Sequence, residues 1–259
     1  MPTYHTIEDE WLAFLTGEHK ELKRGRKIFR LIPSHPRCKW CSAPFGIPGK
    51  FISQLLGKRP ERKNPNFCNA CFSTLKIGGA EIELSFLFAD VRGSTALAER
   101  IGPAAFRNLL NRFYGIAVDV LLAQDALVDK FVGDEVIGLF IPALSGKDHA
   151  NRAIEAAQEL LRRTGHGAGK EPWLPIGAGV HTGIAFVGAV GDENGVRDLT
   201  ALGDPVNTAA RLASVAAAGE ILVSDTALSQ AGIDAGDREQ RNLALKGKSE
   251  TVAVHVLTV

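Results

Sequence analysis

Residues 81–95 read EIELSFLFADVRGST, and this stretch decides the fold of the larger part of the chain. Charged and apolar residues alternate at its start, and the residues that follow are mostly apolar up to Ala89. This change of pattern is typical of a strand that enters a buried core. The strand ends at Asp90, and residues 91–95 open a helix. A carboxylate beside the backbone N–H groups of a helix start suits a site for a metal ion and a phosphate.

The residues after 95 predict further helices and strands in a regular order. Helices are predicted at Pro103 to about Gln124, at 147–163, from Pro205 onward and at 225–231, and strands at 126–132, 135–142, 221–224 and 251–259. Residues 175–191 predict a long strand that its glycines break into a hairpin. A tight turn at Gly133-Asp134 joins two of the strands. The order β-α-β-β-α-β, with additions, predicts an α+β fold with a ferredoxin-like βαββαβ core.

Charge and cysteine content divide the chain into two parts. Residues 1–80 carry 14 Lys/Arg and 6 Asp/Glu, a net charge of +8, whereas the rest carries a net charge of −7. All four cysteines lie in the first part, and Gly78-Gly79 separates the two. We therefore expect a small N-terminal module at 1–79 and a larger domain at 80–259. At 259 residues and 45% hydrophobic content, the chain can bury a core without disulfides.

The cysteines form two Cys-x-x-Cys pairs, RCKWC and FCNAC, whose members are Cys38, Cys41, Cys68 and Cys71. Each pair offers two thiolates from one tight turn, and together they predict a metal site with four sulfur ligands. Structural zinc and an iron–sulfur cluster both accept four cysteines. A third hypothesis is a set of redox thiols without a metal.

Two further features of the N-terminal part bear on partners and location. Residues 6–30 predict a helix with a basic tract, which packs on its own module or on a partner protomer. The alternative is a contact of its basic face with a membrane surface or a nucleic acid, but runs of Lys and Arg are usually solvated. The basic cluster at 58–63 has no interleaved aromatic residues, so nucleic acid is not expected as a partner. We find neither an uncharged apolar stretch long enough for a membrane span nor a signal peptide, and we expect a cytoplasmic protein.

Four motifs in the larger part carry a family resemblance. They are FADVRGST, LVDKFVGDEV 40 residues later, GVHTG, and LTALGDPVNTAARL. In this order they resemble the catalytic domain of class III nucleotidyl cyclases, the adenylate and guanylate cyclases, over about residues 81–259. The pattern is closest to the bacterial and soluble subclass called IIIb. The resemblance implies that Asp90 and Asp134 bind two catalytic Mg²⁺ or Mn²⁺ ions, and that Lys130 and Thr200 read the purine base.

The resemblance also assigns roles after Gly203. Asn207 orients the ribose, and Arg211 stabilises the charge that develops on the transferred phosphoryl group. These residues are four apart, so a helix places them on one face. The LKGK motif resembles the phosphate-binding basic position of the family, which we match to Lys246 rather than Lys248. His181 in GVHTG is expected to be a core or hydrogen-bonded histidine and not a base.

The activity implied by this resemblance is conversion of ATP to 3′,5′-cyclic AMP and pyrophosphate. In the family the metal aspartates and the Lys/Thr/Asn/Arg set come from opposite sides of a dimer interface, so a homodimer with two composite sites is implied. Thr200 can donate as well as accept a hydrogen bond, which leaves a guanylate or pyrimidine nucleotide cyclase as an alternative. Two further hypotheses are a diguanylate cyclase and a catalytically silent, cyclase-like interaction protein.

Overall fold

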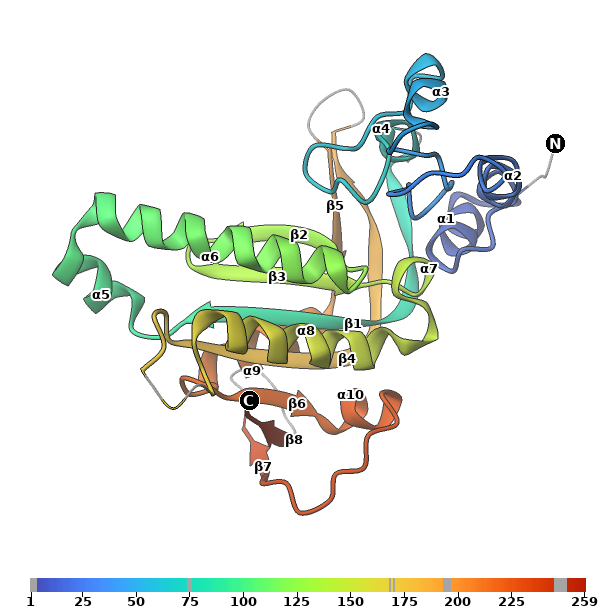
Figure 1. Ribbon diagram of the computed structural model, residues 1–259. Coiled ribbons are helices and arrows are strands. Elements are labelled where there is room, and N and C mark those ends of the chain that lie inside the picture. The colour runs from blue at the N-terminus through green and yellow to red at the C-terminus, as the bar shows by residue number, and fades with distance from the viewer. Residues whose placement is uncertain (1–3, 74–75, 168, 170, 193–196, 245–250) are drawn as a thin grey trace. The chain divides into compact units, whose positions relative to one another are not determined.

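The computed structural model describes residues 4–73, 76–167, 169, 171–192, 197–244 and 251–259 (Figure 1). The helices are α1 Ile7–Leu15, α2 Lys20–Phe29, α3 Lys50–Leu55, α4 Asn69–Ser73, α5 Ser94–Ile101, α6 Pro103–Ala123, α7 Pro142–Ser145, the short 3₁₀ helix Gly146–Asp148, α8 His149–Thr164, α9 Asp204–Val215 and α10 Asp225–Gln230. The strands are β1 Gly78–Val91, β2 Leu127–Val132, β3 Glu135–Phe140, β4 Ile176–Gly191, β5 Arg197–Leu202, β6 Ile221–Ser224, β7 Gln240–Leu243 and β8 Val252–Leu257.

The chain forms two compact units. The first comprises Met1–Ile82, Ile141–Gly146 and Phe186–Ala201, and the second comprises Glu83–Phe140, Lys147–Ala185 and Leu202–Val259. Strands β1 and β4 contribute residues to both units. The predicted boundary between two domains at residues 79 and 80 therefore stays a prediction, because the first unit combines segments from both sides of that boundary.

The strands form one sheet in the order β2-β3-β1-β4-β6-β8-β7, with β5 paired to β4. Strands β4 and β6 run parallel, whereas β1–β3, β2–β3, β6–β8 and β7–β8 are antiparallel. The register of β1 on β3 sets Asp90 opposite Glu135. A mixed sheet with helices packed on it is the predicted α+β architecture, and this prediction is confirmed.

In the second unit, helices pack on apolar residues of both faces of the sheet. Helices α6 and α8 lie along one face (Figure 1), where Phe113 and Ile154 pack with Ile221 and Val223 of β6. The intervening Leu222 points to the opposite face and packs with residues of α9. Alternation along β6 thus follows the two-residue period of a strand that is covered on both sides.

Two predicted elements need correction. Residues 176–191 form one continuous strand, β4, and not a hairpin; β4 pairs with β5. Its glycines serve close packing, since a Cβ on Gly179 would lie 2.4 Å from the backbone nitrogen of Ala213. The helix predicted over 6–30 is two helices, because the chain turns at Gly17, whose φ of 82° favours glycine.

Aromatic side chains form the core of the cysteine-bearing part of the first unit. The Trp40 ring stacks on Phe67 at 4.1 Å between centroids and lies 4.3 Å from Phe14. Trp40 and Phe67 are fully buried, so the loops that carry the cysteines share one small core with α1. In the described part of the chain, we find no helix with the length and apolar character that a membrane crossing requires.

Candidate active site and metal centre

Two aspartates that the sequence singles out come together at one edge of the second unit. Asp90 lies near the end of β1, and Asp134 lies in the turn between β2 and β3. Burial raises the pKa of Asp90, and Asp134 raises it further through its charge and a side-chain hydrogen bond, whereas Arg92 lowers it. The pairing of β1 with β3 thus brings the two half-buried carboxyl groups close enough for Asp134 to affect the pKa of Asp90.

A third carboxylate, Glu135, joins this cluster and was not predicted. Burial raises the pKa of Glu135 to about 7, and the charges of Asp90 and Asp134 contribute to the rise. Because the charge of Asp134 contributes to the raised pKa of both Asp90 and Glu135, the cluster is a favourable setting for a divalent cation, which removes such repulsion. The one sequence signal for Glu135 was its place directly after Asp134. In the structure it lies opposite Asp90, near the end of the neighbouring strand β1.

Arg92 connects the carboxylate cluster to α9. Its guanidinium forms an ion pair with the Asp90 carboxylate. Its Nη1 donates to the backbone oxygens of Ser214, at 2.8 Å, and Ala216, at 3.4 Å. These carbonyls belong to the C-terminal end of α9, which has the negative end of the helix dipole. One side chain therefore fixes both the Asp90 carboxylate and the end of the helix that carries Asn207 and Arg211.

Helix α9 presents the two residues that we expect to act on ribose and phosphate. Asp204 opens the helix, and Pro205 lies in its first turn, where a missing N–H is tolerated. Asn207 is exposed and Arg211 is half-buried, one turn apart. The predicted helix and the shared face of these two side chains are confirmed; their roles stay predictions.

The residues predicted to read the base lie in different units. Lys130 is on β2 in the second unit, and its Nζ lies 3.6 Å from Oδ2 of the buried Asp129. Thr200 is on β5 in the first unit and is buried. Lys246 and Lys248 lie outside the described residues. His181 donates to or accepts from Ser224 Oγ at 2.8 Å, which confirms a hydrogen-bonded histidine.

A cavity of about 390 Å³ adjoins the carboxylate cluster. Its lining includes Ser94 and Thr95 at the start of α5, together with Gly133 and Asp134 of the β2–β3 turn. Gly93, which precedes α5, has a φ of 66°, so glycine suits the sharp turn into the helix. Backbone N–H groups at a helix start are donors for a phosphate, and this cavity has room for one beside the carboxylates.

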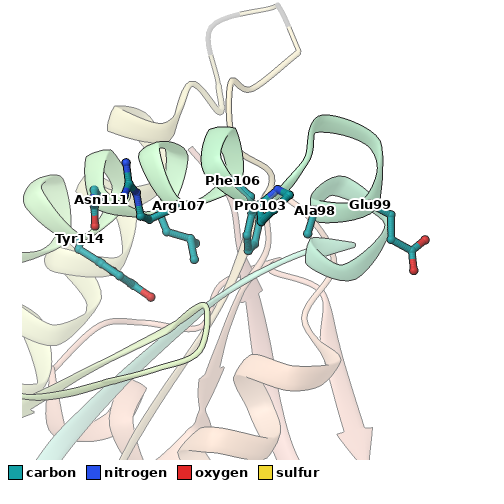
Figure 2. Close-up of a pocket in the computed structure, with 8 residues that line it drawn as sticks. Ala98, Glu99, Pro103, Phe106, Arg107, Asn111 and Tyr114 are labelled. Carbon is teal, nitrogen blue, oxygen red and sulfur yellow. The ribbon is translucent and has the colours of Figure 1, made fainter.

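Figure 2 shows a neighbouring cavity, of about 560 Å³, lined by residues of α5 and α6. Its labelled residue Tyr114 points toward the β2–β3 turn, and its hydroxyl donates to the carbonyl of Gly133. The Tyr114 ring stacks on Phe131 at 4.5 Å between centroids. Burial raises the pKa of Tyr114, and the charge of Asp134 adds to this. Tyr114 therefore braces the turn that carries Asp134, a role that sequence reasoning missed.

The four cysteines converge on one point in the first unit. Their Sγ atoms all lie within 4.8 Å of one another, and the Sγ atoms of Cys41 and Cys68 are 3.7 Å apart. All four side chains are buried and none forms a disulfide. The backbone N–H of Cys68 donates to Cys38 Sγ at 3.3 Å, and that of Cys71 donates to Cys68 Sγ at 3.4 Å. Such donors stabilise thiolates, so this set fits a metal ion.

Helix α2 packs directly on this cysteine set. A Cβ on Gly25 would lie 3.4 Å from the Cβ of Cys41, so this glycine allows the close approach. Arg26 Nε donates to the backbone oxygen of Trp40 at 2.6 Å, between the first two cysteines. The basic part of the helix predicted from the sequence therefore packs on the loop that carries the first cysteine pair.

Comparisons with known proteins agree with this geometry. The family model described as the adenylate and guanylate cyclase catalytic domain matches residues 80–258. Rv1318c of Mycobacterium tuberculosis is 33% identical over 168 residues, which are 64% of this chain and 29% of that protein. Rv1319c of the same organism is 29% identical over 168 residues, again 29% of its length. The chain thus spans less than a third of these curated relatives.

Two solved structures are similar over the same part of the chain. The guanylyl cyclase Cya2 has 31% identity and a TM-score of 0.60, and the match covers 70% of this chain and 93% of that one. The adenylyl cyclase CyaB from P. aeruginosa has 30% identity and a TM-score of 0.59, and the match covers 70% of this chain and 96% of that one. These two neighbours differ in the base of their nucleotide.

Proposed function

Because this chain belongs to the adenylate and guanylate cyclase catalytic domain family through residues 80–258, we propose that it converts ATP to 3′,5′-cyclic AMP and pyrophosphate. The observation that carries this proposal is the cluster of Asp90, Asp134 and Glu135 beside a cavity at the start of α5. In the reaction, the ribose 3′-oxygen bonds to the α-phosphorus. The bond from that phosphorus to the bridging oxygen breaks, pyrophosphate leaves, and the 3′ proton passes to solvent.

Asp90 and Asp134 would hold two Mg²⁺ or Mn²⁺ ions. Hard cations prefer carboxylate oxygens, and such cations remove the repulsion that Asp134 adds to the effect of burial on the pKa of Asp90. When bound, these ions lower the pKa of the ribose hydroxyl and neutralise phosphate charge. Arg92, through its ion pair, holds the Asp90 carboxylate in place.

The remaining polar residues bind and orient the nucleotide in this proposal. The Arg211 guanidinium donates to the oxygens of the transferred phosphoryl group, because a planar fork matches spread negative charge. Asn207, one turn earlier on α9, orients the ribose. Lys246 neutralises the triphosphate. Lys130 and Thr200 read the purine edge by donating to a ring nitrogen and accepting from an exocyclic amine.

We propose that the active protein is a homodimer with two composite sites. One chain carries both the aspartates and the Lys130/Thr200/Asn207/Arg211 set, so a head-to-tail pair supplies each site from two protomers. A monomer then has two incomplete half-sites and is inactive.

A nucleotide panel tests the activity and the base. The protein is incubated with Mn²⁺ and ATP, GTP, CTP or UTP, and the products are identified by mass. We expect cyclic AMP as the fastest product, and no product from Asp134→Asn. Asp237→Asn, which changes an exposed carboxylate outside the cluster, is the matched control and retains activity. Faster turnover of GTP contradicts the ATP assignment, and no cyclic nucleotide from any substrate contradicts the enzyme.

We propose that the four cysteines bind one Zn²⁺ ion. A tetrahedral zinc site with bonds of about 2.3 Å separates its sulfurs by about 3.8 Å. The observed 3.7 Å between Cys41 and Cys68, and the 4.8 Å limit on all pairs, fit one metal ion. In an iron–sulfur cluster the cysteines bind different irons joined by sulfide, which spreads them further apart.

Elemental analysis of protein purified without chelators tests the zinc proposal. We expect about one zinc per chain. A brown protein that contains iron and acid-labile sulfide contradicts it. We also propose that the reaction takes place in the cytoplasm, because its reducing environment keeps cysteine thiols from forming disulfides.

A further inference from the structure

Helix α3 in the first unit exposes its apolar residues. A helix that packs only on its own module would bury them. It buries Ser53, which is 1% exposed, and it exposes Phe51 at 68% and Leu55 at 88%. Ile52, Leu56 and the preceding Ile47 are also exposed. Large exposed apolar side chains gathered in one segment are unusual, and such patches mark interaction surfaces. We refer to Ile47, Phe51, Ile52, Leu55 and Leu56 as the α3 surface.

The segment is anchored, so the exposure is not that of a loose loop. Ser34 Oγ donates to the carbonyl of Gly46 at 2.6 Å, ahead of the helix. After the helix, the N–H of Lys58 donates to the carbonyl of Ser53 at 2.7 Å, and the N–H of Arg59 donates to Asn69 Oδ1 at 2.8 Å. Asn69 directly follows Cys68. The chain between the two cysteine pairs therefore projects the α3 surface from the metal site.

Basic residues flank these apolar side chains along the chain, and one of them, Lys63, forms an ion pair with Asp198 at 2.7 Å. Residues 44–63 contain five Lys/Arg and one Glu, a net charge of +4. Lys50, Arg59 and Arg62 are exposed, whereas the Glu61 carboxylate accepts the backbone N–H groups of Lys63 and Asn64. Apolar side chains with a basic rim match the interface of an anionic lipid bilayer, where the apolar groups enter the acyl region and the cations contact headgroups.

The composition of the α3 surface favours an anionic membrane over two other partners, a second copy of the chain and a nucleic acid. A second copy of the chain that docked through its own α3 surface would bring its +4 segment to the same contact, and like charges would repel. A nucleic acid would leave the aliphatic side chains uncovered, since Phe51 is the one aromatic residue of the α3 surface. We propose that the α3 surface docks this module on the surface of an anionic membrane. This proposal is independent of the nucleotide cyclase activity.

Vesicle flotation of the full chain, with its metal bound, tests the proposal. We expect the protein to float with vesicles of phosphatidylcholine and phosphatidylglycerol and not with phosphatidylcholine alone. Phe51→Ser with Leu55→Ser should lower binding by more than about tenfold, because two apolar side chains no longer enter the bilayer. Arg59→Glu with Arg62→Glu should lower it by at least about tenfold, and 0.5 M salt should act in the same direction.

Two controls make each outcome decisive. Ile184→Ser removes a side chain of similar exposure, 63%, from β4 in the second unit and should leave vesicle binding unchanged. Phe51→Trp should show quenching by brominated acyl chains that the wild-type protein does not show. The proposal is overturned if the Phe51→Ser/Leu55→Ser variant binds anionic vesicles as well as the wild type does, or if the wild type does not bind them. It is also overturned if the substitutions change only the oligomeric state. Because flotation needs no nucleotide, its failure leaves the proposed enzyme untouched.

Discussion

Gly179→Ala tests how closely α9 must lie on the sheet. Gly179 is in β4, and a Cβ there would lie 2.4 Å from the backbone nitrogen of Ala213 and 2.6 Å from the carbonyl oxygen of Ala209. Both atoms belong to the backbone of α9, so no flexible side chain can move away. To reach an ordinary carbon contact of about 3.5 Å, the helix must withdraw by about 1 Å.

This withdrawal has a cost in stability and in activity. Overpacking of a tight interior typically costs about 1–3 kcal/mol, so we expect Gly179→Ala to lower the free energy of unfolding by that amount. Asn207 and Arg211 move with α9. A misplacement of about 1 Å can lower a rate by about a hundredfold, and we expect a loss of kcat of at least tenfold.

Gly115→Ala is the matched control. Gly115 lies inside α6, and among the described atoms outside its own helix turn none lies within 4 Å of the added Cβ. Alanine favours a helix over glycine by about 1 kcal/mol, so this variant should be more stable than the wild type and equally active. Urea denaturation gives both free energies. A Gly179→Ala protein with wild-type stability and activity refutes the close packing of α9 on β4.

The other predictions concern the site and the metal centre. Arg92→Met, which keeps the side-chain length but removes the ion pair to Asp90, should raise the metal concentration for half-maximal activity by at least about tenfold, and unchanged metal dependence argues against its positioning role. Glu135→Gln should relieve repulsion and stabilise the metal-free protein by about 1 kcal/mol, measured by thermal unfolding in EDTA, whereas a lower stability would contradict a repulsive cluster. Cys68→Ser should release the zinc and unfold the aromatic core around Trp40, seen as a red shift of its fluorescence, and retention of both would exclude a four-sulfur site.

Local patterns predicted much of the larger unit. The apolar run before Asp90, the Gly133-Asp134 turn and the helix opened by Pro205 are found where the sequence puts them, because each depends on neighbours in the chain. The meeting of Asp90 with Asp134 followed from the resemblance, and the register of β1 on β3 provides its physical cause.

Features that depend on distant contacts were missed. The continuous strand β4 appeared broken because its glycines resemble turn residues. In the structure they allow close packing, of Gly179 against α9 and of Gly188 against Gly78 and Gly79 of β1. Arg92, Tyr114 and Glu135 gain their roles from contacts across elements, which no local pattern encodes. The inverted exposure of α3 likewise depends on what surrounds Ser53.

Subunit complementation tests most directly the claim that one chain supplies both halves of a cyclase site. Asp90→Ala and Arg211→Ala are each expected to form inactive homodimers. After equal amounts are mixed and exchange is proven by tagged pull-down, half of the dimers are mixed, and each has one intact site, so cyclic AMP production should recover to about a quarter of the wild-type rate. No recovery despite proven exchange, or full activity of either variant alone, would contradict the composite site.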